Sequence, residues 1–172
     1  MKRIRYSVAM SLDGFIAGPA GESDWIVSDP DIDFDALLAE FDTVVMGRKT
    51  FEEAWIGGDT MPGMRVIVVS RTLKDEDYPD VTVVGAGMEG TLRELRRGEG
   101  KDIWLFGGGS LFRSLLELGL VDTVEVAVIP VLLGDGRPML EHPTDQAQLR
   151  LAGTRLYEKS GIMALHYDVE EP

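Results

Sequence analysis

The sequence of 172 residues contains no cysteine and only two histidines. The absence of cysteine excludes disulfides, thiolate metal sites and cysteine nucleophiles. Basic residues are also few, because 17 Lys and Arg stand against 30 Asp and Glu and leave a formal net charge of -13. Such a field opposes nucleic acids and anionic membranes, so a bound anion must be held by a local cluster of donors and cations.

Long apolar runs are absent as well, and no stretch approaches the roughly 20 apolar residues of a membrane-spanning helix. Residues 1–10 lack the apolar core and cleavage site of a signal peptide. We therefore expect no membrane partner, no nucleic-acid partner and a cytoplasmic location. Neither His142 nor His166 has a carboxylate cluster beside it in the sequence, so we expect no metal site. The length and the hydrophobic share of 44% predict a single domain over residues 1–172.

Short apolar segments and segments of helical periodicity alternate along the first two thirds of the chain. Strands are predicted at 4–10, 15–17, 43–46, 65–69, 81–84 and 103–106. Helices are predicted at 32–41, from 51 onward, at 91–97 and at 111–118. The last third is typical of longer strands without helices between them, at 123–129, 149–158 and 162–169. This order predicts an α/β sandwich with parallel central strands, helices on both faces and an antiparallel C-terminal edge.

Two strands pass directly through glycine into a helix, at Gly47-Arg48-Lys49-Thr50 and at Gly107-Gly108-Gly109-Ser110. Glycine lets a backbone approach a ligand, and the free amides of a helix start favour phosphate. One such turn often serves topology alone. Two of them at the carboxyl edge of one sheet suit the two phosphates of a dinucleotide, and Ser70-Arg71 after another strand adds a third group of donors.

Residues 85–90, Gly-Ala-Gly-Met-Glu-Gly, match the fingerprint G-x-G-x-x-G of dinucleotide-binding proteins. In a Rossmann unit an acid at the end of the following strand binds the ribose. Here Asp102 precedes that strand and Phe106 ends it. We therefore interpret residues 85–90 as a loop beside the adenine half of a cofactor rather than as a Rossmann motif.

Four motifs occur together in an order that resembles the dihydrofolate-reductase-like superfamily. They are VAMSLDGFIA at 8–17, MGRKTF at 46–51, FGGGSL at 106–111 and PVLLGDG at 130–136. The sequence is most similar to the branch that contains the reductase domain of bifunctional riboflavin-biosynthesis deaminase-reductases. The resemblance implies an eight-stranded, mostly parallel sheet in a three-layer sandwich, with NADPH across its carboxyl edge. Deamination is excluded, because the zinc signature of the deaminase domain requires cysteine.

Carried over by position, the resemblance assigns the cofactor contacts. Arg48, Lys49 and Thr50, after Gly47, would contact the cofactor phosphates. Ser70 and Arg71 would contact the adenosine side with its 2'-phosphate, and Ala9 would lie against the nicotinamide. The pyrophosphate would be bound by Gly107, Gly108, Gly109 and Ser110. These cations suit NADP better than NAD, because the additional phosphate calls for Arg or Lys.

The implied activity is an NADPH-dependent reduction of a small heterocyclic or imine substrate, as in 5-amino-6-(5-phosphoribosylamino)uracil reductase. Reduction of dihydrofolate is one alternative. Non-catalytic NADPH binding is the other, because Ala54 stands where the pyrimidine reductases that the chain resembles carry an Asp. Asp29 and Asp31 are the candidate proton donors, although acids near a helix start are also typical of a solvated surface. Trp25 is the candidate pocket wall or, alternatively, a core anchor of its loop.

Two further expectations concern the end of the chain. Arg137 either holds an anionic part of the substrate or belongs to a plain hairpin. The apolar strand at 124–131 and the long terminal strands predict self-association, and the family that the chain resembles commonly forms dimers. A homodimer that binds a small-molecule substrate is therefore expected.

Overall fold

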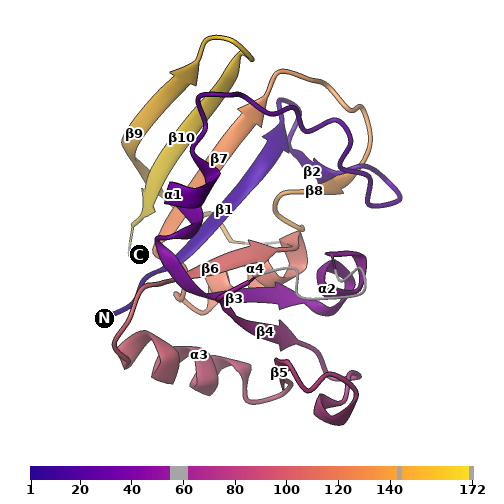
Figure 1. Ribbon diagram of the computed structural model, residues 1–172, viewed down its shortest axis with the longest axis vertical. Helices are drawn as coiled ribbons and strands as arrows, with labels where there is room; N and C mark the ends of the chain where they lie inside the picture. The colour runs from indigo at the N-terminus through magenta and orange to yellow at the C-terminus, as the bar shows by residue number, and fades with distance from the viewer. Residues whose placement is uncertain (55–61, 143–144, 171–172) are drawn as a thin grey trace.

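One eight-stranded sheet organises the protein (Figure 1). The computed structural model describes residues 1–54, 62–142 and 145–170. The strand order across the sheet is β5-β4-β3-β6-β1-β7-β10-β9. In chain order these strands are β1 (Ile4–Ser11), β3 (Phe41–Gly47), β4 (Arg65–Val69), β5 (Val81–Val84), β6 (Asp102–Gly107), β7 (Thr123–Ile129), β9 (Leu149–Tyr157) and β10 (Ile162–Val169).

Six of the strands, β5 to β7 in the order across the sheet, run parallel. β10 is antiparallel to β7, and β9 is antiparallel to β10. Two short strands, β2 (Phe15–Ala17) and β8 (Arg137–Pro138), form a separate antiparallel pair. The predicted mixed sheet with an antiparallel C-terminal edge is therefore confirmed, while β8 lies in a segment where no strand was predicted.

Helices cover both faces of the sheet, as predicted. On one face, here called the α4 face, lie α3 (Met88–Arg97) and α4 (Gly109–Glu117). Their apolar residues pack on alternate positions of the central strands, and the ring of Tyr6 stacks on Phe112 at 3.8 Å between centroids. Tyr6 and Leu115 are fully buried on this face. The apolar cluster here is larger than the one on the opposite face.

The opposite face, here called the cavity face, is covered by α1 (Phe34–Leu38) and α2 (Arg48–Ala54). Phe51 of α2 is buried with Val44 and Met46 of β3. α1, in contrast, has no buried residue. In Figure 1 it lies in front of β1 and β7. The sheet is therefore closely covered beside β3 and β4 and loosely covered beside β1 and β7.

Two predicted helices differ from the observed ones. The helix predicted at 32–41 is observed only as α1, because Phe41 is the first residue of β3. Its apolar side chains have the predicted helical spacing, yet Phe34 is 54% exposed and Leu37 is 45% exposed. α2 begins at Arg48, earlier than the predicted start at residue 51. No helix among the described residues is long and apolar enough to cross a membrane.

Candidate functional site

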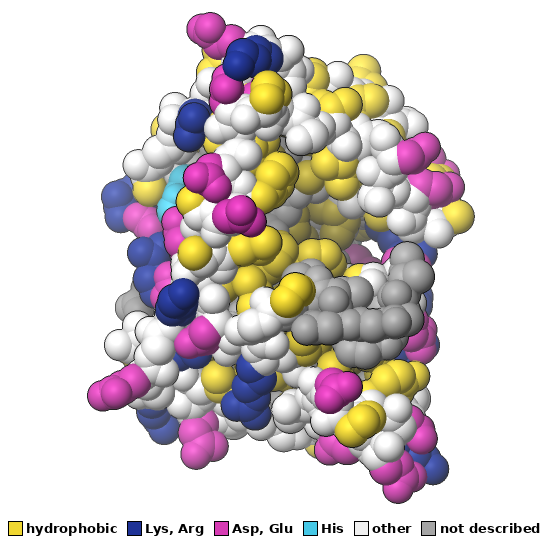
Figure 2. All heavy atoms as spheres, viewed as in Figure 1, with side chains coloured by type: hydrophobic (Ala, Val, Ile, Leu, Met, Phe, Trp, Pro, Cys, Tyr) yellow, Lys and Arg dark blue, Asp and Glu magenta, His cyan; other side chains and the backbone are white. Residues whose placement is uncertain are grey.

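A cavity of about 1460 Å³ lies over the cavity face of the sheet. Its floor is formed by β1, β7, β10 and β9, and its outer wall includes Phe34, Leu37 and Leu38 of α1. The ends of β3, β4 and β6 and the starts of α2 and α4 close it on the other side. In Figure 2 apolar side chains gather around the hollow in the middle of this face.

The predicted cofactor-binding residues lie at this site. The cavity is lined by Ala9, Gly47, Arg48, Lys49, Thr50, Ser70, Arg71, Gly108, Gly109 and Ser110, whereas Gly107 does not line it. The parallel register explains this convergence, because Gly47 of β3 stands beside Val69 of β4 and Met46 stands beside Gly107 of β6. Strand ends that are far apart in the sequence therefore meet at one edge.

The start of α4 lies at this edge, and no side chain among the described residues caps it. Its N-cap is Gly108, which has no side chain to accept hydrogen bonds from the first turn. The following Gly109 lies so close to another segment that a Cβ atom there would stand 2.5 Å from the carbonyl oxygen of Pro138. Only glycine fits at this position, and its lack of a side chain lets β8 lie close to the start of α4.

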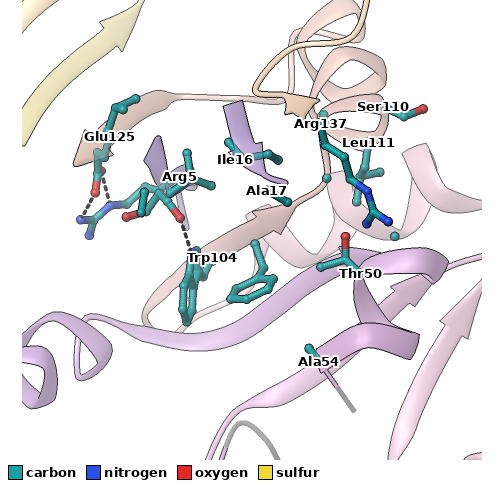
Figure 3. Close-up of a pocket in the computed structure, with 18 of the residues that line it drawn as sticks. Arg5, Ile16, Ala17, Thr50, Ala54, Trp104, Ser110, Leu111, Glu125 and Arg137 are labelled. Atoms are coloured by element: carbon teal, nitrogen blue, oxygen red, sulfur yellow. Dashed lines mark hydrogen bonds and ion pairs between the residues drawn. The ribbon is translucent and has the colours of Figure 1, made fainter. Parts of the chain in front are cut away.

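The cations of the site differ in their partners. Arg48 is 3.0 Å from Glu52 within α2, and Arg137 of β8 is 2.6 Å from Glu53. Figure 3 shows Arg137 reaching from β8 towards α2. Lys49 and Arg71 have no carboxylate within 4.0 Å among residues 1–54, 62–142 and 145–170. They are therefore free to bind an external anion.

Ser70 has a structural role at the end of β4. Its Oγ accepts hydrogen bonds from the amides of Thr72 at 3.1 Å and Leu73 at 3.0 Å. These bonds form the turn that positions Arg71 at the cavity.

An ion-pair network centred on the buried Arg5 lies on the cavity face of the sheet, and Figure 3 shows Arg5 beside Glu125. Arg5 is 9% exposed, and its Nε and Nη2 donate to the two carboxylate oxygens of Glu125 at 2.7 and 2.8 Å. Its Nη1 donates to Glu40, directly after α1, and its guanidinium lies 4.6 Å from the ring centroid of Phe41. Burial raises the pKa of Glu125, but the hydrogen bonds and charge of Arg5 outweigh burial and hold this pKa below its usual range.

The sequence did not predict this network or the residues beside it. His166, which is isolated in the sequence, has its Nε2 3.6 Å from Glu125. The alternation of side chains along β1 could have indicated Arg5, because Arg5 and Ala9 are an even number of residues apart in that strand and therefore face the same side of the sheet. Placing Ala9 at the nicotinamide therefore also places Arg5 on the cavity face.

The three candidate catalytic residues lie beside the cavity but do not line it. Asp29 is 1% exposed and accepts hydrogen bonds from the amides of Ser160 and Asp31, both at 2.9 Å. Hydrogen bonding to Ser160 lowers its pKa. Asp31 pairs with Lys159 at 2.9 Å, and the indole nitrogen of Trp25 donates to the carbonyl oxygen of Glu22 at 2.9 Å.

The contacts of Asp29 and Asp31 tie the loop before α1 to the turn between β9 and β10. The proposed roles of Asp29 and Asp31 as proton donors stay predictions, as does the role of Trp25 as a pocket wall. The carboxylates that do line the cavity are those of Glu40, Glu53, Glu89, Glu125 and Glu141.

Two solved structures share this fold. A riboflavin biosynthesis protein from Shewanella sp. PV-4, so described in its crystal structure, superposes with a TM-score of 0.82 at 24% identity, over 99% of this chain and 100% of the other. Dihydrofolate reductase from Enterococcus faecalis, solved with NADP(H) and RAB-propyl, superposes with a TM-score of 0.68 at 19% identity, over 98% and 97%. The expected dihydrofolate-reductase-like fold is therefore confirmed.

Sequence comparison gives one relative of similar length and a longer one. The chain is 33% identical to the Bacillus subtilis protein YyaP over 182 residues, covering 96% of this chain and 94% of the other. It is 26% identical to the riboflavin biosynthesis protein RibD of Corynebacterium ammoniagenes over 151 residues, covering 78% of this chain but 45% of the other. Residues 2–162 match the RibD C-terminal domain. The chain therefore belongs to the RibD C-terminal domain family.

Proposed function

We propose that the protein is an NADPH-dependent reductase that reduces a C=N bond in a small planar heterocycle or imine. The observation that carries the proposal is that Lys49, Arg71 and the uncapped amides of α4 line the same cavity as Ala9. Such an arrangement of cations and helix amides suits the phosphates of a dinucleotide. When bound, NADPH would supply the hydride.

The chain's own residues would orient and desolvate the reacting groups. The small side chain of Ala9 would let the nicotinamide lie against β1. The apolar wall of α1 would exclude water from the ring that accepts the hydride. A proton for the product nitrogen would come from water or from one of the glutamates that line the cavity. Asp29 and Asp31, the candidates from the sequence, lie beside the cavity and would have to act through a water molecule.

Cofactor selectivity tests the phosphate site. Calorimetric titration should show tight binding of NADPH and weak binding of NADH. Arg71→Ala should weaken NADPH binding by about 10- to 100-fold, the loss expected for one or two charge-assisted hydrogen bonds, and leave NADH binding unchanged. Arg65→Ala is the matched control, because Arg65 lies exposed at the opposite end of β4. Equal affinities for both cofactors in the wild-type protein would refute the assignment.

The substrate class follows from turnover rather than binding. Reduction of an aminopyrimidine with a phosphoribosyl group would indicate an activity like that of 5-amino-6-(5-phosphoribosylamino)uracil reductase. Reduction of dihydrofolate would support the alternative, a dihydrofolate reductase activity. The candidate proton donors Asp29 and Asp31 do not line the cavity, which is the observation that favours a non-catalytic NADPH-binding protein. NADPH binding without oxidation across both substrates and simple pterins would establish that second function.

We further propose a cytoplasmic homodimer that associates through the antiparallel edge. Leu151 and Leu156 of β9 are 53% and 52% exposed, and they stand opposite Tyr167 and Met163 of β10. Exposed leucines on an edge strand favour association with another surface. Sedimentation should give a dimer at micromolar concentration, and Leu151→Glu with Leu156→Glu should give a monomer. A monomeric wild-type protein would refute this proposal.

A further inference from the structure

The cavity has two halves whose walls differ in charge. The half beside α2 and the ends of β3 and β4, here called the α2 half, is lined by the basic side chains of Arg48, Lys49, Arg71 and Arg137. The half between α1 and the strands β1, β7, β10 and β9 is here called the α1 half. Since an anion bound by Lys49 and Arg71 would lie in the α2 half, the walls of the α1 half decide which second ligand binds beside it.

The outer wall of the α1 half is apolar. It includes Phe34, Leu37 and Leu38 of α1 and Ile26 of the preceding loop. Each of these four side chains is at least 37% exposed. Apolar surface that borders a cavity and remains exposed is available to a ligand, and its removal from water favours binding. The wall therefore favours a ligand with apolar surface of its own.

The floor of the α1 half consists of small side chains. Ala9 of β1 stands beside Ala127 of β7, which stands beside Ala164 of β10. Residues in register on neighbouring strands point to the same face of a sheet, and all three alanines line the cavity. Three methyl groups in a row leave room above the sheet for a flat ring and offer that ring no polar side chain.

The charged groups beside this floor carry a surplus of negative charge. Arg5 donates hydrogen bonds to Glu40 and Glu125. Its Nη1 also lies 3.5 Å from Asp102, so one guanidinium is shared among three carboxylates. The Nε2 of His166 lies 3.6 Å from Glu125, and a protonated His166 would offset one of these charges at most. An anionic group of a ligand would therefore be repelled here.

The segment that forms the outer wall adds to this charge. Residues 29–40 contain five acidic residues and no Lys or Arg. Lys159 pairs with one of them, Asp31. Arg155 lines the cavity as well, but it is exposed on the edge strand β9 and lies 4.6 Å from the ring centroid of Tyr157. Its single charge does not offset the surplus, so the α1 half is apolar and electronegative where the α2 half is basic.

We propose that the α1 half binds an aromatic molecule that is uncharged or cationic and carries neither a phosphate nor a carboxylate group. Its ring lies over the three alanines, and its apolar part lies against Phe34 and Leu37. As a statement about the substrate of the reductase, this inference rests on the proposed function, whereas the charge preference of the cavity does not. A phosphoribosyl aminopyrimidine and dihydrofolate, which both carry anionic groups, are then poorer substrates than the corresponding uncharged rings.

The test uses two compounds that differ in a single anionic group. 1-Anilinonaphthalene is an uncharged aromatic amine, and 1-anilinonaphthalene-8-sulfonate is the same molecule with one sulfonate. Each is titrated into the full chain labelled with nitrogen-15, and NMR follows the amides of Leu37 and Ala164 in the α1 half and of Arg71 in the α2 half. Because the signals are resolved by position, sulfonate binding in the α2 half is recorded separately.

We expect saturable shifts of Leu37 and Ala164 with the uncharged compound, and binding of the sulfonate at the same two amides that is about tenfold weaker. The proposal is overturned if the sulfonate binds there as tightly as the uncharged compound. It is also overturned if the uncharged compound gives no saturable shift at these amides.

Two pairs of variants test the wall and the charge. Leu37→Ala should weaken binding of the uncharged compound about three- to tenfold, whereas Leu132→Ala, at an exposed residue that does not line the cavity, should leave it unchanged. Glu40→Gln should raise the affinity for the sulfonate about threefold. Glu117→Gln removes the same charge at the end of α4, away from the cavity lining, and should change neither affinity. Equal effects within either pair would overturn the corresponding part of the argument.

The proposed function fails separately from this inference. Absence of NADPH binding in calorimetry would refute the reductase, while the preference between the two compounds would remain. Conversely, a reductase that binds NADPH but has a lower KM for a phosphoribosyl aminopyrimidine than for its unphosphorylated counterpart would refute the substrate class and leave the reductase function intact.

Discussion

Removing Arg5 should destabilise the fold strongly, because its side chain is only 11% exposed and pairs with the carboxylates of Glu40 and Glu125. Arg5→Met keeps the apolar stem but leaves Glu125 buried without its partner and frees Glu40. Breaking a buried ion pair from one side costs about 3–5 kcal/mol, since an uncompensated charge remains. We therefore expect the free energy of unfolding in urea to fall by about that amount.

A double-mutant cycle separates the pair from its surroundings. Glu125→Leu alone should also destabilise, because Arg5 then keeps only Glu40 and the more distant Asp102. The double variant Arg5→Met with Glu125→Leu should cost much less than the sum of the single changes, since a buried pair replaced by apolar residues is often near neutral. The control is Arg3→Met, at a residue whose side chain is 48% exposed and 4.0 Å from Asp168. It should cost about 0–1 kcal/mol.

The pair also predicts a pH dependence. The pKa of Glu125 is lower in the folded protein than its usual value, so the stability that it contributes is present above about pH 4.3, the ordinary pKa of glutamate. This contribution is lost as the pH falls through the folded pKa. A stabilising buried pair is refuted if Arg5→Met lowers the free energy of unfolding no more than Arg3→Met does, or if the effects of Arg5→Met and Glu125→Leu are simply additive.

Two further predictions concern close contacts away from this pair. Gly109→Ala should lower the free energy of unfolding by about 1–3 kcal/mol, because its Cβ would stand 2.5 Å from the carbonyl oxygen of Pro138. Gly90→Ala should raise the free energy of unfolding by about 0.4–1 kcal/mol, because there is open space around its Cβ in α3. Urea unfolding that ranks the two variants in the opposite order would contradict the structure. Asp29→Asn should reduce the loss of stability at acidic pH, because hydrogen bonding to Ser160 lowers the pKa of Asp29 in the folded protein. The stability that Asp29 contributes is present above about pH 3.9 and is lost below it. This prediction is contradicted if the urea midpoint of the variant falls as steeply as that of the wild-type protein between about pH 5 and 2.5.

The strand pattern of this protein is local, and the sequence therefore predicted it well. Residues 65–69, 81–84, 123–129 and 162–169 were expected as strands and are observed with those bounds. Each is a continuous or alternating apolar run, which depends on neighbours within a few residues. The glycine turns that bring the predicted cofactor residues to one cavity are local in the same way.

The features that the sequence did not predict depend on distant partners. Asp29 is fixed by Ser160, which lies 131 residues away, so its carboxylate could not be distinguished from the surface acids around it. Phe34 and Leu37 have the spacing of a core-facing helix but border a cavity instead of a core. Periodicity shows that a face is apolar and leaves open what covers it. The single domain predicted over residues 1–172 stays a prediction.

The absence of buried side chains in α1 has a consequence for how the protein opens. A helix whose apolar side chains stay about half exposed gains less from the rest of the fold than a fully packed one, so it can unfold locally while the sheet stays intact. Its amides should exchange with deuterium through small, frequent openings, whereas those of α4, with four buried residues, should exchange only on global unfolding. α1, which borders the cavity, would then be less protected than α4, and entry of a ligand would not require the core to move.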